Sequence, residues 1–147
     1  MKIQMVPLAL ALSGFGLLGL PVVSVLSGEG VARAADAAFA LKLEVPPAKK
    51  GQRAVVKLRL SPGSGFHMNK DFPTSLVLAA PPGVTLEKPR QTAADARFSE
   101  TGADFEVALT ASEPGSKLVS GELKFAVCTA TTCDPKREKV SFTLEVK

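Results

Sequence analysis

The stretch Phe125-Ala-Val-Cys-Thr-Ala-Thr-Thr-Cys-Asp-Pro135 contains both cysteines of the chain, Cys128 and Cys133. Strand-like sequence precedes the pair over residues 121–127 and follows it over residues 138–146. Two such runs joined by a short polar segment predict a β-hairpin. The cysteines flank its loop, so we expect them to lie nearly opposite each other. Opposed Cβ atoms lie about 4.5–5.5 Å apart, close to the roughly 3.5–4.5 Å that a disulfide needs.

A bridge across so short a loop would stabilise the fold only modestly. Chain-entropy arithmetic predicts about 2 kcal/mol for a closed loop of about six residues, against almost 5 for about 100 residues. Strand alternation places Phe125 and Val127 on one face, and Lys124 and Cys128 on the other. Without a bulge, we therefore expect the Cys128 sulfur to face solvent or a partner, where thiols exchange. A redox-active pair and a structural bridge both stay open.

The rest of the chain repeats the same alternation of apolar and polar residues between turns rich in proline and glycine. Residues 89–103 are polar, lack a clean period and are expected to form the longest loop. No helical period is long enough to predict a helix after the N-terminal segment. The pattern predicts an all-β sandwich of seven to eight strands. The expected strands are 39–45, 53–60, 66–69, 75–79, 84–87, 105–109, 121–127 and 138–146.

Residues 1–34 have the pattern of a secretory signal peptide. Lys2 provides a positive start, an apolar run extends from Val6 to Leu26, and Ala32-Arg33-Ala34 fits the small-x-small cleavage pattern. Cleavage would leave a single domain over residues 35–147. The apolar run is long, so an uncleaved membrane anchor is the alternative. Export would place both thiols in an oxidising compartment, where disulfides persist.

Composition and histidine count exclude several kinds of function. The net charge is +4, yet the basic residues are scattered and Trp and Tyr are absent, so we expect no nucleic-acid partner. His67 is the only histidine, which leaves too few ligands for a four-ligand Cys/His zinc site or a blue-copper site. A metal site formed by His67, Met68 and the two thiols is a weaker hypothesis. We expect no cofactor.

Three segments, in order, resemble a known family. They are Gly65-Phe-His-Met-Asn-Lys70, Pro81-Pro-Gly-Val84, and the cysteine segment with its short loop and Pro135. From about Phe39 to Val146 the chain resembles the N-terminal periplasmic domain of the thiol:disulfide interchange protein DsbD. The resemblance implies an immunoglobulin-like β-sandwich. The family's membrane domain and C-terminal thioredoxin domain are absent from this sequence, so we expect a stand-alone exported protein, periplasmic or, with an uncleaved signal segment, anchored to the inner membrane.

The resemblance assigns the chemistry to the cysteine pair. Cys128 and Cys133 would be catalytic, with Cys133 attacking first, in a component of a thiol-disulfide oxidoreductase system. Its partners would be thioredoxin-fold proteins or a membrane thiol-disulfide reductase. His67 and Asn69 occupy positions where the family has aromatic residues, and Phe98 is the only aromatic residue near its cap loop. The alternative is a non-catalytic periplasmic binding or assembly domain with a structural disulfide.

Overall fold

The fold consists of strands along which buried and exposed residues alternate. The computed structural model describes residues 37–147, so the predicted signal segment, residues 1–34, lies outside the described residues. Between residues 37 and 147, no helix is both long and apolar enough to cross a membrane. The elements are β1 (Phe39–Glu44), β2 (Arg53–Pro62), β3 (His67–Met68), β4 (Ser75–Ala79), β5 (Val84–Leu86), β6 (Arg90–Thr92), the 3-10 turn η1 (Ala93–Asp95), β7 (Arg97–Ser99), β8 (Gly102–Ala111), β9 (Gly115–Cys128) and β10 (Cys133–Val146).

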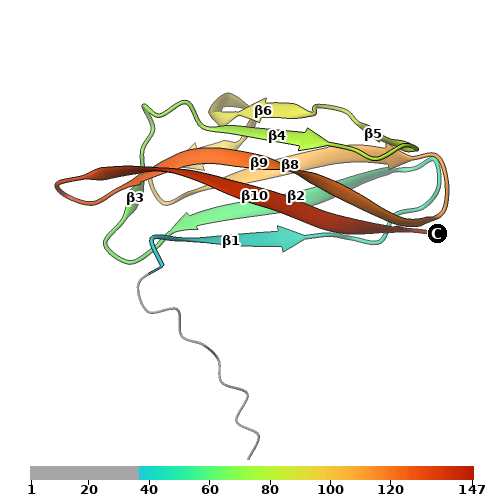
Figure 1. Cartoon of the computed structure of the whole chain (residues 1–147), viewed down its shortest axis with the longest axis horizontal. Coiled ribbons are helices and arrows are strands. Elements are labelled where there is room, and N and C mark those ends of the chain that lie inside the picture. The colour runs from blue at the N-terminus through green and yellow to red at the C-terminus, as the bar shows by residue number, and fades with distance from the viewer. Residues whose placement is uncertain (1–36) are drawn as a thin grey trace, which may run out of the picture. The chain divides into compact units, whose positions relative to one another are not determined.

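The strands form two antiparallel sheets of five strands each. One sheet has the order β1-β2-β8-β5, with β7 also paired to β8. The other has the order β10-β9-β4-β6, with β3 also paired to β9. Figure 1 shows the tip of the β9–β10 hairpin and β3 at one end of the sandwich, and the C-terminus at the other. The predicted all-β sandwich is confirmed.

The expected loop over residues 89–103 is the main difference from the prediction. It contains β6, η1 and β7, and these two short strands bring the described strands to ten, against the seven to eight expected. Strands of three residues are too short to show a period of two, so pairing with β4 and β8 reveals them where the sequence does not. Most of the predicted strands are found within a few residues of their expected bounds.

The core lies between the sheets. Its largest fully buried side chains include Phe105 of β8 and Phe125 of β9. Phe125 also meets Phe39 of β1 edge to face, with ring centroids 4.9 Å apart, so an aromatic contact joins the two sheets. A polar contact joins them as well, because the buried Gln91 of β6 donates from Nε2 to the carbonyl of Glu106 in β8, at 2.9 Å. The core therefore fixes the position of β9, which carries Cys128.

Candidate functional site

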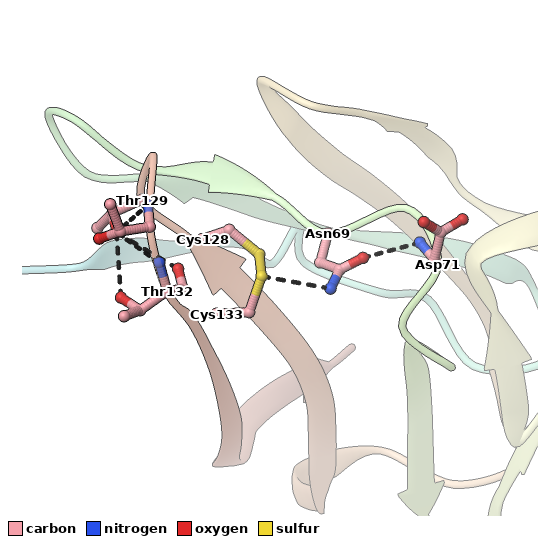
Figure 2. The surroundings of a disulfide bond; sticks show 7 residues. Asn69, Asp71, Cys128, Thr129, Thr132 and Cys133 are labelled. Atoms are coloured by element: carbon pink, nitrogen blue, oxygen red, sulfur yellow. Dashed lines mark hydrogen bonds between the residues drawn. A yellow bond between two sulfur atoms is a disulfide. The ribbon is translucent and has the colours of Figure 1, made fainter.

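The two cysteines form a disulfide at the loop end of the β9–β10 hairpin. Cys128 and Cys133 are direct partners in the strand register, with Cα atoms 4.0 Å apart. Their sulfur atoms are bonded at 2.02 Å. Figure 2 shows the bridge spanning the ends of the two strands. The predicted hairpin and its local bridge are both present.

The two ends of the bridge differ in exposure. Cys128 is only 3% exposed, whereas Cys133 is exposed. The reason is the sheet order, because Cys128 ends the central strand β9 between β10 and β3, while Cys133 begins the edge strand β10. The expectation that Cys128 faces solvent is therefore wrong. Of the two bridged residues, Cys133 is therefore the one exposed to solvent.

Hydrogen bonds within the loop hold the cysteines in register. The backbone N–H of Thr129 donates to the carbonyl of Thr132 at 2.7 Å. The Thr129 hydroxyl oxygen accepts from the backbone N–H groups of Thr131 and Thr132, at 3.3 and 3.2 Å. A threonine hydroxyl that accepts from the residues ahead of it is a common way to close a tight turn. The loop is thus closed by contacts that do not involve the sulfur atoms.

Asn69 places a donor against the sulfur of the exposed residue, Cys133. Its side-chain Nδ2 donates to Cys133 Sγ at 3.7 Å, and its Oδ1 accepts from the backbone N–H of Asp71 at 2.9 Å (Figure 2). Its own backbone N–H donates to the carbonyl of Ala126 in β9, also at 2.9 Å. The family resemblance places Asn69 near the pair, but the hydrogen bond to sulfur was missed. The spacing Asn-x-Asp, which favours an Asx turn, was the available signal.

A shallow hollow of about 300 Å³ opens beside the bridge. The backbone N–H of Met68 donates to the carbonyl of Glu100 at 2.8 Å, which brings the β7–β8 turn against β3. Across the hollow, Lys70 Nζ lies 3.4 Å from the Glu100 carboxylate. Its walls therefore carry both signs of charge. The lining residues are His67, Met68, Asn69, Lys70, Asp71, Glu100, Cys128 and Cys133.

The residues of the metal hypothesis do not form a common ligand set. His67 is the cross-strand neighbour of Cys128 and is exposed, but the adjacent Met68 is buried in the core. Neighbouring residues of a strand point to opposite faces, so these two side chains cannot converge on one ion. Over residues 37–147, no group of three or more His, Cys, Asp or Glu side chains is placed to hold a metal.

No protein-family model and no curated protein matches the chain. Among solved structures, it is similar to a conjugative transposon lipoprotein from Bacteroides eggerthii, with 11% identity, a TM-score of 0.41, and 74% of this chain and 98% of that chain covered. It is also similar to AggA, the major subunit of aggregative adherence fimbriae type I from Escherichia coli, with 7% identity, a TM-score of 0.38, and 74% and 95% covered. A third similarity is to BslA, a bacterial hydrophobin, with 10% identity, a TM-score of 0.34, and 76% and 96% covered. At this level of similarity they assign neither a family nor a function.

Proposed function

We propose that the protein is an exported thiol-disulfide interchange module of the kind found at the N-terminus of DsbD. Cys128 and Cys133 would cycle between dithiol and disulfide and pass electrons to thioredoxin-fold partners. The observation that carries the proposal is the arrangement of the bridge, which has one exposed sulfur-bearing residue, one buried one, and an open hollow beside them. Exchange requires an accessible sulfur and a clear line of attack.

The forward reaction transfers two electrons in two displacements. In the dithiol form, the Cys133 thiolate attacks one sulfur of the partner's disulfide, which forms a mixed disulfide and releases the partner's other sulfur as a thiolate. Cys128, once deprotonated, then attacks Cys133 Sγ, which closes the intramolecular bridge and releases the second partner thiolate. The two protons lost by the cysteines balance those that the partner's thiolates take up. The protein is oxidised and the partner is reduced.

The strand register suits this cycle. Fourteen residue pairs join β9 to β10, and Cys128 pairs with Cys133 at the end of that ladder. The turn hydrogen bonds of Thr129 close the loop independently of the sulfur atoms. The two thiols therefore stay side by side after reduction, and the resolving attack by Cys128 needs no rearrangement of the backbone.

The dithiol form must be regenerated by another thiol protein. A membrane thiol-disulfide reductase with a lower reduction potential would attack the oxidised bridge at its exposed residue, Cys133. Its own thiol pair would become a disulfide, and the two electrons would return to Cys128 and Cys133. Access through one end means that donor and acceptor would use the same face in turn.

Trapping the mixed disulfide tests the proposal. In Cys128→Ser, Cys133 can attack a partner but nothing resolves the product, so disulfide-linked complexes with exported thioredoxin-fold proteins should accumulate. The matched variant Cys133→Ser leaves only the buried thiol and should trap far less. Non-reducing electrophoresis of the exporting cells, with free thiols alkylated at lysis, measures both. Absence of linked complexes in Cys128→Ser would contradict the exchange function.

A second candidate function follows from the burial of Cys128. A bridge with one end buried in a central strand is also what a purely structural disulfide would look like. The domain would then bind or assemble through its surface, and the cysteines would only secure the hairpin. In that case the double variant Cys128→Ser/Cys133→Ser would keep its binding partner, whereas an exchange module would lose partner capture.

A further inference from the structure

We propose that Asn69 stabilises the Cys133 thiolate and thereby makes Cys133 the attacking sulfur. The inference rests on the proposed exchange function, because it assigns the activation of that reaction to a specific side chain. It is carried by the contact of Asn69 Nδ2 with Cys133 Sγ at 3.7 Å (Figure 2). A donor against a sulfur atom favours the charged form of that sulfur over its neutral form.

The orientation of the Asn69 amide follows from its surroundings. The backbone N–H of Asp71 is a donor only, so the group that faces it at 2.9 Å must be the Asn69 oxygen. The NH₂ group is therefore the one directed at the sulfur. The backbone N–H of Asn69 is itself tied to the carbonyl of Ala126 in β9. Both ends of the residue are thus held, and the donor is in position before any reaction begins.

The amide acts selectively because hydrogen bonds to an ionised acceptor are roughly twice as strong as those between neutral groups. In the oxidised protein, the Cys133 sulfur is a weak acceptor and the contact is long. After reduction, the same donor would meet a thiolate and gain strength. Cys128 has no such side-chain donor among the hydrogen bonds of residues 37–147. This difference, added to the difference in exposure, distinguishes the two sulfurs.

The charged groups around the bridge do not replace the amide. Lys70 and Glu100 form an ion pair across the hollow, and Asp134 and Lys136 form another on β10, with 2.5 Å between Nζ and Oδ2. Paired charges largely cancel at a distance. The other titratable side chains that line the hollow are those of Asp71 and His67. The carboxylate of Asp71 opposes a thiolate but lies on the far side of Asn69 from the bridge (Figure 2).

Alkylation of the free thiol tests the inference without a partner. In the Cys128→Ser background, the rate of Cys133 alkylation is followed from pH 5 to pH 10. Asn69→Ala, which removes the donor without adding charge, should move the midpoint of the profile to higher pH. Below the midpoint, the rate should fall about tenfold for each unit of that shift, since only the thiolate reacts. Asn69→Asp keeps the acceptor for Asp71 N–H and adds a negative charge, so its shift should be larger and in the same direction.

Asp71→Asn is the matched control, since only its backbone N–H takes part in the turn. It removes a negative charge and should leave the midpoint in place or move it to lower pH. An unchanged or lowered midpoint in Asn69→Ala would overturn the inference, even if Asn69→Asp shifted upward. The trapping experiment reports separately on the proposed function. If Cys128→Ser traps partners but Asn69→Ala leaves the alkylation profile unshifted, only the role of Asn69 is refuted. If the alkylation profile shifts but no partner is trapped, only the exchange function is refuted.

Discussion

The two ends of the β9–β10 hairpin are held together by different forces. At the far end, Leu144 and Val146 are buried, and Val146 also pairs with Ala48 in a parallel bridge. At the loop end, Cys133 is exposed and the turn is closed by the hydrogen bonds of Thr129. The far end of β10 is stabilised by apolar burial, whereas its loop end is exposed and is held by polar contacts and one covalent bond.

This difference separates stability from chemistry. Full burial of one leucine contributes about 1.5–3 kcal/mol, which is as much as the roughly 2 kcal/mol expected from a disulfide across so short a loop. The sandwich can therefore hold its shape while the bridge opens and closes. An exchange site needs that independence, because a bridge on which folding depended could not be reduced in each cycle.

The largest expected effect comes from the buried far end. Leu144→Ala should lower the free energy of unfolding by about 2–5 kcal/mol, because it removes a side chain with no exposed surface and leaves a cavity. Leu118→Ala is the matched control on the neighbouring strand. Leu118 is 60% exposed, so its change should stay within about 0.5 kcal/mol. Urea unfolding of both oxidised variants measures the difference.

The same variants test whether the two ends are independent. Reduction of the bridge by dithiothreitol under native conditions should proceed at the wild-type rate in Leu144→Ala, since the substitution lies at the opposite end of the hairpin. A rate that rose in step with the lost stability would show that the bridge opens only through unfolding. The separation of the two ends would then be wrong.

The second largest effect is expected from removal of the bridge itself. Cys128→Ser/Cys133→Ser should lose about 2 kcal/mol of unfolding free energy, because the loop that it closes is short. The variant should keep the sandwich, which far-ultraviolet circular dichroism would show. A loss comparable to that of Leu144→Ala at its upper limit, or failure to fold, would mean that the loop end depends on the bridge.

A smaller effect is expected from the turn. Thr129→Val removes the hydroxyl that accepts two backbone N–H groups and should cost about 1 kcal/mol. The cost should be greater in the reduced protein, because the disulfide constrains the same loop in the oxidised one. Thr131→Val is the control, since the hydroxyl of Thr131 makes no hydrogen bond in the described turn. Equal losses in the two variants would show that Thr129 does not close the loop.

The strands were predictable wherever alternation extends over enough residues. β2 and β10 show it plainly, with Val56, Leu58 and Leu60 buried on one face and the residues between them mostly exposed. The cysteine pairing was predictable too, because it depends only on a local hairpin. The three-residue strands β6 and β7 were not, since their pairing with distant strands defines them.

The pairing of the two cysteines was predictable from the sequence, but the exposure of each cysteine was not. The predicted hairpin correctly places Cys128 opposite Cys133, whereas strand parity, from which the exposure of Cys128 was predicted, cannot tell a central strand from an edge strand. The burial of Cys128 comes from β3, which reaches β9 from more than fifty residues away in the chain. Asn69 comes from the same segment. Long-range pairing therefore decides which sulfur can be reached and which side chain touches it.

The smallest expected effect lies on the surface, away from the bridge, and provides a baseline for the other three. Lys88 donates a hydrogen bond to the carboxylate of Asp95, which lowers the pKa of Asp95 from its ordinary value of 3.8, and the backbone N–H of Thr92 adds to that shift. A carboxyl group whose pKa is lowered by folding stabilises the protein above its ordinary pKa. That stabilisation is lost as the pH falls through the lower, folded-state value. Asp95→Asn should therefore be slightly less stable than the wild type at pH 7, and the two should converge near pH 2. Urea unfolding across that range measures the difference, and a gap that stayed constant down to pH 2 would assign the effect to something other than the charge of Asp95.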